Sequence, residues 1–276
     1  MAIYIKKDSV NEKISKVYRK SEGVIREILN IKRKSEGVIR EVYSSKLKTL
    51  CLIHFDVISS ASSAVVKDEV SNTNLGIQNL LGNPVINNNN LMFGVGAAKA
   101  SAYEYGFNLQ LPKEETTFED LGESDFTFEF FAYFTGQFGD SSAGNAVLTS
   151  RVTIGGENYT YGVTINNAGS YGPKIQGNFG ENINIEYGAL PESGAWGHYA
   201  FVRKGSDLSL YINGELKKSI SCSGEGYKFS DMGDMVSAGN YSSSSKLYYD
   251  LDELRISRVA RYTSNFVLTN IAFEVD

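Results

Sequence analysis

The chain has 276 residues, which is enough to bury one large core and to form a small second unit. It contains 17 Tyr, 15 Phe and 27 Gly but only 4 Pro, a mixture typical of many antiparallel strands joined by glycine turns. Two cysteines are too few for a disulfide framework, and no apolar run approaches the roughly 20 residues of a membrane helix.

The formal net charge of −5 hides a division of the chain. Residues 1–50 hold 13 Lys/Arg and 6 Asp/Glu, a net charge of +7, whereas the remainder holds 14 and 26, a net charge of −12. The basic residues alternate with glutamates and lack aromatic stacking platforms, so we expect an acidic protein neighbour and no nucleic acid. Residues 1–8 have no apolar core behind their charges, so we expect no signal peptide and synthesis in a cytoplasm.

A repeat marks the N-terminal segment, where residues 19–28 (RKSEGVIREI) recur as residues 33–42 (RKSEGVIREV), 14 positions later. In one interpretation each Ser-Glu-Gly forms a hairpin turn, with Gly23 and Gly37 supplying the positive φ that such turns need. The flanking segments 14–18, 24–31 and 38–43 are then short strands.

The same offset equals two heptads, and the apolar residues of the repeat also fall at the a and d spacing of a trimeric coiled coil. Against a coiled coil, each helical repeat would carry an interior glycine, which costs about 1 kcal/mol relative to alanine, and a polar d position. The pattern therefore favours strands, with the coiled coil as the alternative.

Residues 14–27 (ISKVYRKSEGVIRE) resemble a short repeat in structural proteins of tailed phages and prophages, where the unit runs roughly VKKAYxGxNGVARK. This sequence departs from that unit by a Glu in the turn and by the loss of the first Gly. The resemblance implies a module that attaches to virion structural proteins. A two-stranded hairpin is marginal in water and its open edges invite pairing. We therefore predict assembly, with copies of the chain or with a partner, through the apolar positions Val24, Ile28, Val38 and Val42.

The junction is expected at 44–46 (SSK), which divides the chain into a module of residues 1–45 and a domain of residues 46–276. Cys51 lies in an apolar run and is expected to be a buried free thiol. Residues 126–134 (FTFEFFAYF) are too apolar for a half-exposed strand and belong inside a sandwich. Residues 198–203 and 208–212 form a hairpin pair, and Asn213-Gly214 predicts a tight turn into a returning strand at 215–219.

Four segments in this order resemble the concanavalin-A-like, laminin-G-type domains common in phage tail proteins. They are 52–56 (LIHFD), 126–131 (FTFEFF), 196–203 (WGHYAFVR) continued by 210–214 (LYING), and 251–257 (LDELRIS) leading to 261–263 (RYT). The resemblance spans residues 50 to about 268 and implies an all-β fold, a two-sheet antiparallel jelly-roll sandwich, after the small N-terminal β-repeat module. This fold hosts lectins, hydrolases and inert spacers alike.

The sequence argues against an enzyme. A glycoside hydrolase needs two carboxylates about 5–9 Å apart, and hydrolases of this fold carry them as Glu-x-Asp-x-x-Glu on one strand. Asp250 and Asp252 share a strand face, but Arg255 stands where the final Glu would be. The two histidines, His54 and His198, lie between apolar neighbours and are expected to be hydrogen-bonded structural residues, without zinc-ligand spacing.

The resemblance also implies a structural calcium ion where the opening and closing strands meet, with Asp56 and Asp252 as candidate ligands. In the alternative, which we favour, no metal or other cofactor is bound, and Asp252 and Glu253 pair with Arg255, Arg258 or Arg261.

For a glycan, aromatic side chains in polar loops are the candidate platforms, because sugars stack on rings and bond to nearby amides and hydroxyls. Four tyrosines have such neighbours: Tyr103, Tyr105, Tyr171 and Tyr241. The only tryptophan, Trp196, precedes a core strand in the family motif and is predicted to pack inside.

The sequence thus favours a virion surface protein of the tail-fibre or adhesin type. Its N-terminal module anchors it to the particle, and its sandwich binds a host surface glycan or receptor, without contact to a membrane. The alternative is a capsid or tail decoration protein with a display role and no dedicated ligand. A glycoside hydrolase ranks behind both.

Overall fold

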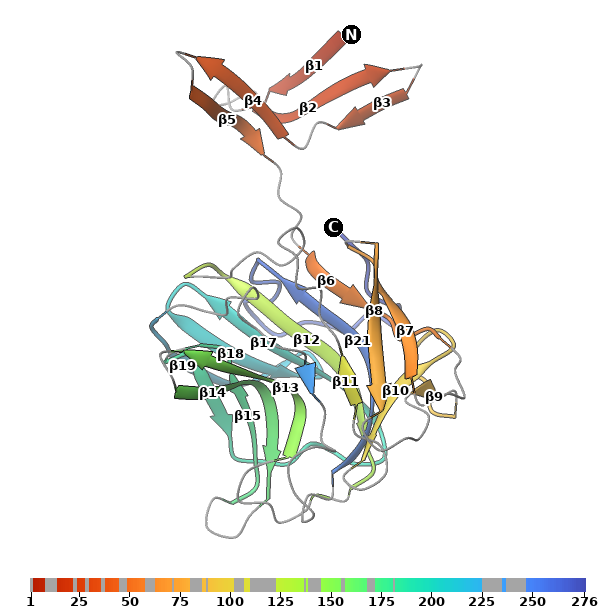
Figure 1. Ribbon diagram of the computed structural model, residues 1–276. Helices are drawn as coiled ribbons and strands as arrows, with labels where there is room; N and C mark the ends of the chain where they lie inside the picture. The colour runs from red at the N-terminus through yellow and green to blue at the C-terminus, as the bar shows by residue number, and fades with distance from the viewer. Residues whose placement is uncertain are drawn as a thin grey trace. The chain divides into compact units, whose positions relative to one another are not determined.

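The chain divides into two compact units, Met1–Leu47 and Lys48–Asp276 (Figure 1). The computed structural model describes residues 2–7, 14–21, 24–27, 30–35, 38–44, 49–57, 63–70, 72–79, 86–87, 89–101, 107–109, 123–136, 138, 145–154, 157–167, 172–180, 182–224, 235–236 and 247–276. Within these ranges there is no helix with the length and apolar character that crossing a membrane requires.

The described residues of the N-terminal unit all lie in strands. β1 (Ala2–Lys7), β2 (Ile14–Ser21) and β3 (Val24–Glu27) form one antiparallel sheet, and β4 (Asn30–Ser35) pairs with β5 (Val38–Ser44). Ser21 is the register partner of Val24, and Ser35 is the partner of Val38. In each copy of the repeat the strands before and after Glu-Gly therefore pair with each other, which confirms the predicted strands and excludes a coiled coil for the described residues.

The larger unit is a sandwich of two antiparallel sheets. The back sheet has the order β19 (Glu215–Ser221), β18 (Asp207–Ile212), β17 (Trp196–Lys204), β12 (Phe126–Phe134), β21 (Tyr248–Ser257), β10 (Ala97–Ser101) and β9 (Ile86–Asn87), with β6 (Thr49–Ile53) also paired to β21. The front sheet has the order β16 (Asn184–Tyr187), β15 (Lys174–Asn178), β14 (Glu157–Asn166), β13 (Asn145–Ile154), β20 (Met235–Val236), β11 (Phe107–Leu109), β8 (Thr73–Asn79) and β7 (Ser63–Asp68). The predicted all-β sandwich is confirmed.

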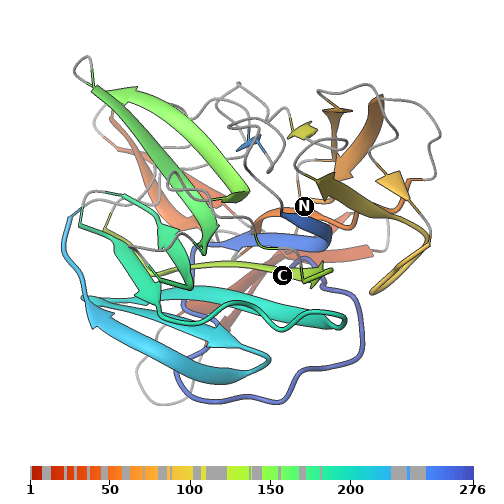
Figure 2. The ribbon, with the colours of Figure 1, turned by 90° about the horizontal axis from the view of Figure 1, so that it is seen from below.

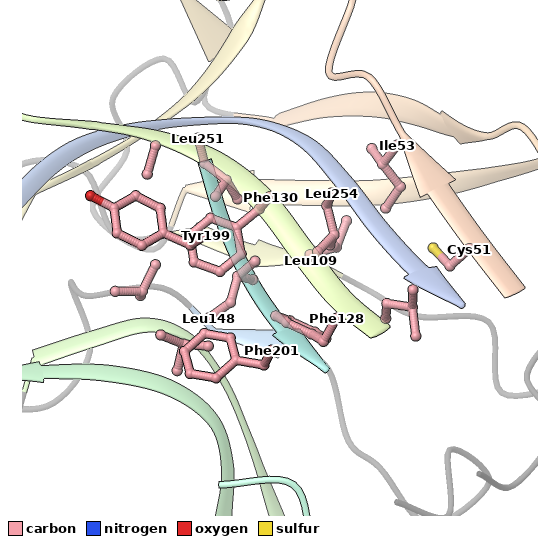
Figure 3. Packing of buried hydrophobic residues seen from close by; sticks show 14 of the residues in the cluster. Cys51, Ile53, Leu109, Phe128, Phe130, Leu148, Tyr199, Phe201, Leu251 and Leu254 are labelled. Atoms are coloured by element: carbon pink, nitrogen blue, oxygen red, sulfur yellow. The ribbon is translucent and has the colours of Figure 1, made fainter. Parts of the chain in front are cut away.

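The core lies between the two sheets and is rich in aromatic rings. Strand alternation sends Phe126, Phe128, Phe130 and Phe134 of β12 inward, where they are at most 2% exposed. Figure 3 shows side chains of the back sheet meeting those of β11 and β13 in the front sheet. Cys51 is buried and free in this core, as predicted, and burial raises the pKa of its thiol.

The outer side of the back sheet is covered by residues 258–276, here called the strap. The rings of Tyr262 and Phe266 stack at a centroid distance of 3.7 Å and pack on Ala200, Val202 and Tyr211 of β17 and β18. Figure 2 shows the strap, in dark blue, running along the outside of these strands. Because the strap covers its outer side and the core its inner side, β12 is buried on both faces, as its sequence predicts.

A tight turn joins β18 to β19. Asn213 and Gly214 have φ values of 52° and 78°, so both occupy the left-handed region that this turn type needs. A Cβ on Gly214 would lie 2.1 Å from the Phe266 carbonyl oxygen, and the Phe266 N–H donates to the Gly214 carbonyl at 2.9 Å. The turn predicted from Asn-Gly is confirmed, and the strap is bonded directly to it.

Candidate functional site

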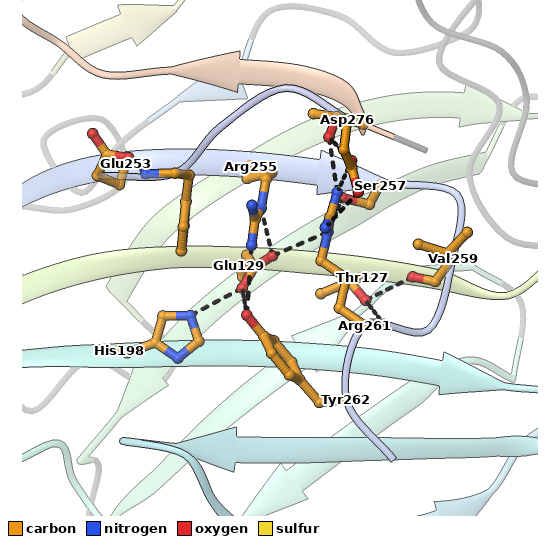
Figure 4. Close-up of polar contacts among 12 residues, drawn as sticks. Thr127, Glu129, His198, Glu253, Arg255, Ser257, Val259, Arg261, Tyr262 and Asp276 are labelled. Atoms are coloured by element: carbon orange, nitrogen blue, oxygen red, sulfur yellow. Dashed lines mark hydrogen bonds and ion pairs between the residues drawn. The ribbon is translucent and has the colours of Figure 1, made fainter. Parts of the chain in front are cut away.

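A buried carboxylate holds the strap to the back sheet (Figure 4). Glu129 Oε1 accepts a hydrogen bond from Arg255 Nε at 2.8 Å, and Oε2 bonds to His198 Nε2 at 3.0 Å and Tyr262 Oη at 2.8 Å. Burial alone would raise the pKa of Glu129, but the bond from His198 and the charge of Arg255 outweigh it and hold the pKa below its ordinary value. Both oxygens are enclosed by these partners, so this cluster is structural.

A second arginine, Arg261, bonds the last residue of the strap to the strands. Arg261 Nη2 donates to Asp276 Oδ1 at 2.7 Å and to Thr49 Oγ1 at 2.8 Å, and Arg261 Nε donates to Ser257 Oγ at 2.7 Å. Residues from β6, β21 and the strap therefore share one polar cluster.

The prediction that Glu253 pairs with an arginine was wrong. Glu253 Oε1 lies 2.5 Å from His54 Nδ1, and Glu253 Oε2 accepts the Phe273 N–H at 2.6 Å. The hydrogen bond to Glu253 raises the pKa of His54. Glu129 and Asp276 instead take the guanidinium groups of Arg255 and Arg261, because strand alternation points Glu129 at the strap. Both histidines are hydrogen-bonded structural residues, as predicted.

The two predicted calcium ligands do meet at one loop. Asp56 Oδ1 accepts the Val95 N–H at 2.7 Å, and Asp252 Oδ2 accepts the Phe93 N–H at 3.1 Å. Burial, together with the charges of Glu253 and Asp56, raises the pKa of Asp252 to about 8. Asp252 forms no ion pair with an arginine of the described residues, contrary to the predicted alternative.

These carboxylates do not by themselves make up a calcium site, since calcium takes 6–8 oxygen ligands. In the described part of the chain, no three His, Cys, Asp or Glu side chains are grouped to hold a metal ion. Asp252 also has both oxygens bonded to backbone N–H groups, of Phe93 and Glu253. Bound calcium stays a prediction.

A groove of about 360 Å³ opens at one end of the sandwich. Its walls come from the end of β16, the connection 188–195, the start of β17, and the turn from β18 to β19. Its volume lies within the about 300–1,000 Å³ of small-ligand sites. Three aromatic residues line it: Tyr187, Trp196 and Tyr199.

Strand geometry gives the Tyr199 ring its place in the groove lining. Gly197 has no side chain, and a Cβ there would lie 2.9 Å from the Tyr199 hydroxyl oxygen, so the glycine leaves room for the tyrosine. The Tyr199 ring is buried, and its hydroxyl has no hydrogen-bond partner among the residues that the structure describes. Burial first, and the Glu192 carboxylate second, raise the pKa of Tyr199, so the hydroxyl stays protonated and can donate to a ligand.

The polar wall of the groove is held in place by backbone contacts. Asn213 Oδ1 accepts the His198 N–H at 2.8 Å, which leaves the Nδ2 amide group to donate outward. Glu215 and Lys217 lie on the same wall and pair with each other at 2.6 Å. The groove thus combines oriented donors with carboxylate acceptors beside aromatic rings.

The prediction that Trp196 packs inside was wrong. Trp196 is only partly buried, its ring lies 6.0 Å from the Tyr133 ring, and its Nε1 donates to Asn90 Oδ1 at 3.2 Å. The reason is strand alternation along β17, which points Tyr199 and Phe201 to the core and leaves Trp196 and His198 off it. Trp196 is one of the residues that line the groove.

Other predicted site residues cannot be placed in this way. Tyr103, Tyr105, Tyr171 and Tyr241 all lie outside the described residues, and so does Ile28. Val24 is the first residue of β3, and Val38 and Val42 lie on β5. Their role in assembly stays a prediction.

Comparisons with known proteins agree with this fold. Residues 104–264 match a family model described as the Concanavalin A-like lectin/glucanases superfamily. Domain 4 of AbnA, an extracellular GH43 arabinanase of Geobacillus stearothermophilus solved with arabinotriose, is similar with a TM-score of 0.51 and 15% identity, over 78% of this chain and 95% of that one.

The ligand-binding domain of botulinum neurotoxin serotype D, solved with N-acetylneuraminic acid, is similar with a TM-score of 0.53 and 13% identity, over 81% of this chain and 48% of that one. A Trypanosoma rangeli sialidase is similar with a TM-score of 0.50 and 9% identity, over 77% of this chain and 30% of that one. The chain spans about half the length of the toxin domains that it matches.

A search of curated proteins found no match to this chain. The structural similarities, all at low identity, support the fold alone. The family model, in contrast, covers more than half of the sequence and includes β12, the β17–β19 meander and β21. The chain belongs to the Concanavalin A-like lectin/glucanases superfamily.

Proposed function

We propose that the sandwich is a noncatalytic glycan-binding domain and that it binds saccharide in the groove beside Trp196. The observation that carries the proposal is the composition of that groove. Its lining combines the aromatic residues Tyr187, Trp196 and Tyr199 with the fixed Asn213 amide, and the Tyr199 hydroxyl has no hydrogen-bond partner among the described residues. Sugars present C–H faces that stack on aromatic rings and hydroxyls that bond to oriented polar groups, so the groove offers both kinds of contact.

The comparisons support this proposal by analogy of fold. The arabinanase domain was solved with arabinotriose and the toxin domain with N-acetylneuraminic acid, so two proteins of this fold hold saccharides. Fold analogy does not identify a ligand. The groove residues therefore supply the main support.

The absence of catalysis belongs to the proposal. The sequence lacks the Glu-x-Asp-x-x-Glu strand of hydrolases with this fold, because Arg255 replaces the last carboxylate. Arg255 bonds to Glu129, the carboxylate at the centre of the back sheet. Glu129 is fully buried under the strap, where a glycosidic bond has no access to it.

The test is an oligosaccharide array probed with residues 46–276, compared with the Trp196→Ala variant. We expect binding by the wild-type domain and its loss in the variant, at a nearly unchanged melting temperature. Val267→Ala is the matched control, because Val267 is 91% exposed on the strap, away from the groove lining. Binding that survives Trp196→Ala would contradict the groove assignment.

We further propose that the chain is a tail-fibre or adhesin component of a virion, made in the host cytoplasm and anchored through residues 1–45. The phage-like repeat supports this, as do strands β1–β5, which form only small sheets with open edges. Such edges favour pairing with another copy or with a virion structural protein. Charge substitutions at Val24 and Val38 should then block incorporation into particles. Normal incorporation would show that attachment does not use the repeat.

A further inference from the structure

The groove beside Trp196 has an unbalanced negative charge. Its lining contains three charged side chains, Glu192, Glu215 and Lys217. Lys217 Nζ lies 2.6 Å from Glu215 Oε2, so these two charges cancel. The adjacent Lys174 and Glu186, 2.7 Å apart, also cancel. Glu192 is exposed and forms no ion pair with any residue that the structure describes.

The Glu192 carboxylate belongs to the groove lining. Glu192 and Tyr199 line the same groove, and the charge of Glu192 adds to burial in raising the pKa of Tyr199. A ligand that bonds to the Tyr199 hydroxyl therefore lies in the field of an uncompensated carboxylate. The hydroxyls of a sugar can donate to that carboxylate in charge-assisted hydrogen bonds.

We infer that the groove selects neutral saccharides and rejects anionic ones such as sialylated or sulfated glycans. This inference rests on the proposed function and specifies its ligand class. It separates this chain from the neurotoxin domain, which was solved with N-acetylneuraminic acid, an acid.

The size of the selection follows from Coulomb's law. An anionic group about 6 Å from the Glu192 carboxylate, at an effective dielectric constant of about 40, is repelled enough to weaken binding about tenfold. Because the groove is open to solvent, salt should screen this repulsion, and most of the difference should vanish when the Debye length falls to about 3 Å at 1 M salt.

The experiment uses residues 46–276 and an array of matched glycans, each neutral oligosaccharide beside its sialylated and sulfated derivatives, at low and at 1 M salt. We expect each bound neutral glycan to bind about tenfold tighter than its anionic derivatives at low salt. Glu192→Gln should remove that difference. The readout is the ratio of neutral to anionic binding, because glutamine also loses the charge-assisted bonds to sugar hydroxyls.

Glu123→Gln is the matched control for net charge. Glu123 is exposed and lies close to Asp125, which bonds to Lys204 at the far end of β17 from Trp196, about 26 Å away at the rise of a strand. This variant should keep the selection. If anionic derivatives bind as tightly as neutral glycans to the wild-type domain, the inference is wrong and the proposed function stands. If no glycan of either kind binds, the proposed function fails and the inference fails with it.

Discussion

Replacing Glu129 with glutamine should remove much of the stability of the sandwich. The carboxylate takes bonds from Arg255, His198 and Tyr262, and glutamine keeps its shape but turns one acceptor into a donor. If the oxygen of the glutamine amide accepts from Arg255, the NH2 group of the same amide faces Nε2 of His198. Nε2 must then accept a hydrogen bond, so a neutral imidazole carries its proton on Nδ1. Nδ1 of His198 has no hydrogen-bond partner among the described residues.

The magnitude follows from these contacts. A buried donor or acceptor left unpaired costs about 1–3 kcal/mol, and loss of one member of a buried ion pair costs about 3–5 kcal/mol. The two costs overlap, so we expect a loss of about 3–5 kcal/mol in the free energy of unfolding. That is a large fraction of the roughly 5–15 kcal/mol typical of a folded domain.

The assay is urea unfolding of residues 46–276, read from the midpoint and slope of the transition. Glu215→Gln is the control, because it breaks an exposed ion pair with Lys217 and should leave the midpoint unchanged. The pKa of Glu129 is lowered in the folded state, so its contribution is complete above the unfolded value of about 4.3 and is lost as the pH falls through the folded value.

The acid-induced loss of stability should therefore be weaker in Glu129→Gln than in the wild-type domain. A midpoint within about 1 kcal/mol of wild type, with an identical acid slope, would refute the assignment of Glu129 as a structural carboxylate.

Three further predictions concern the groove, the turn and the domain division. Phe201→Ala should destabilise the domain by about 3–5 kcal/mol, with a matching fall in melting temperature. Trp196→Ala should lower the melting temperature far less, because Trp196 is partly exposed. Equal falls in melting temperature would show that the indole packs in the core. Gly214→Ala should destabilise the domain and weaken glycan binding together, since a Cβ would meet the Phe266 carbonyl; unchanged values of both would show that the turn tolerates a side chain. Deletion of residues 1–45 should leave a cooperative thermal transition, and a molten product would contradict the division.

Much of the fold could be predicted because the sequence contains strong local signals. The apolar strand at 126–134 and the Asn213-Gly214 turn each specify their own geometry, and both agree with the structure. The strap was missed. Its residues show no strand alternation, and its role depends on Glu129, which lies about 130 positions away in sequence.

The groove could not be predicted for a related reason. Trp196 was assigned to the core from its place in a motif, but alternation along β17 leaves it outside. The Asn-Gly pair was recognised as a turn, yet nothing local indicates that the Asn213 side chain accepts the His198 N–H. Glu192 and Tyr199 line the same groove because the connection 188–195, which bonds to Phe134 of β12, carries Glu192 there, and no local sequence pattern indicates this.

The central position of β21 has a consequence for synthesis on the ribosome. β21 pairs with β12, β10 and β6, so it joins parts of the back sheet that are translated much earlier. Ile53 and its register partner Leu254 are made some 10–40 s apart at about 5–20 residues per second. From the completion of β12 until β21 is made, β12 has an open edge toward the missing strand, and its apolar sequence is exposed to self-pairing. We therefore expect the nascent chain to need protection until residue 257 has emerged.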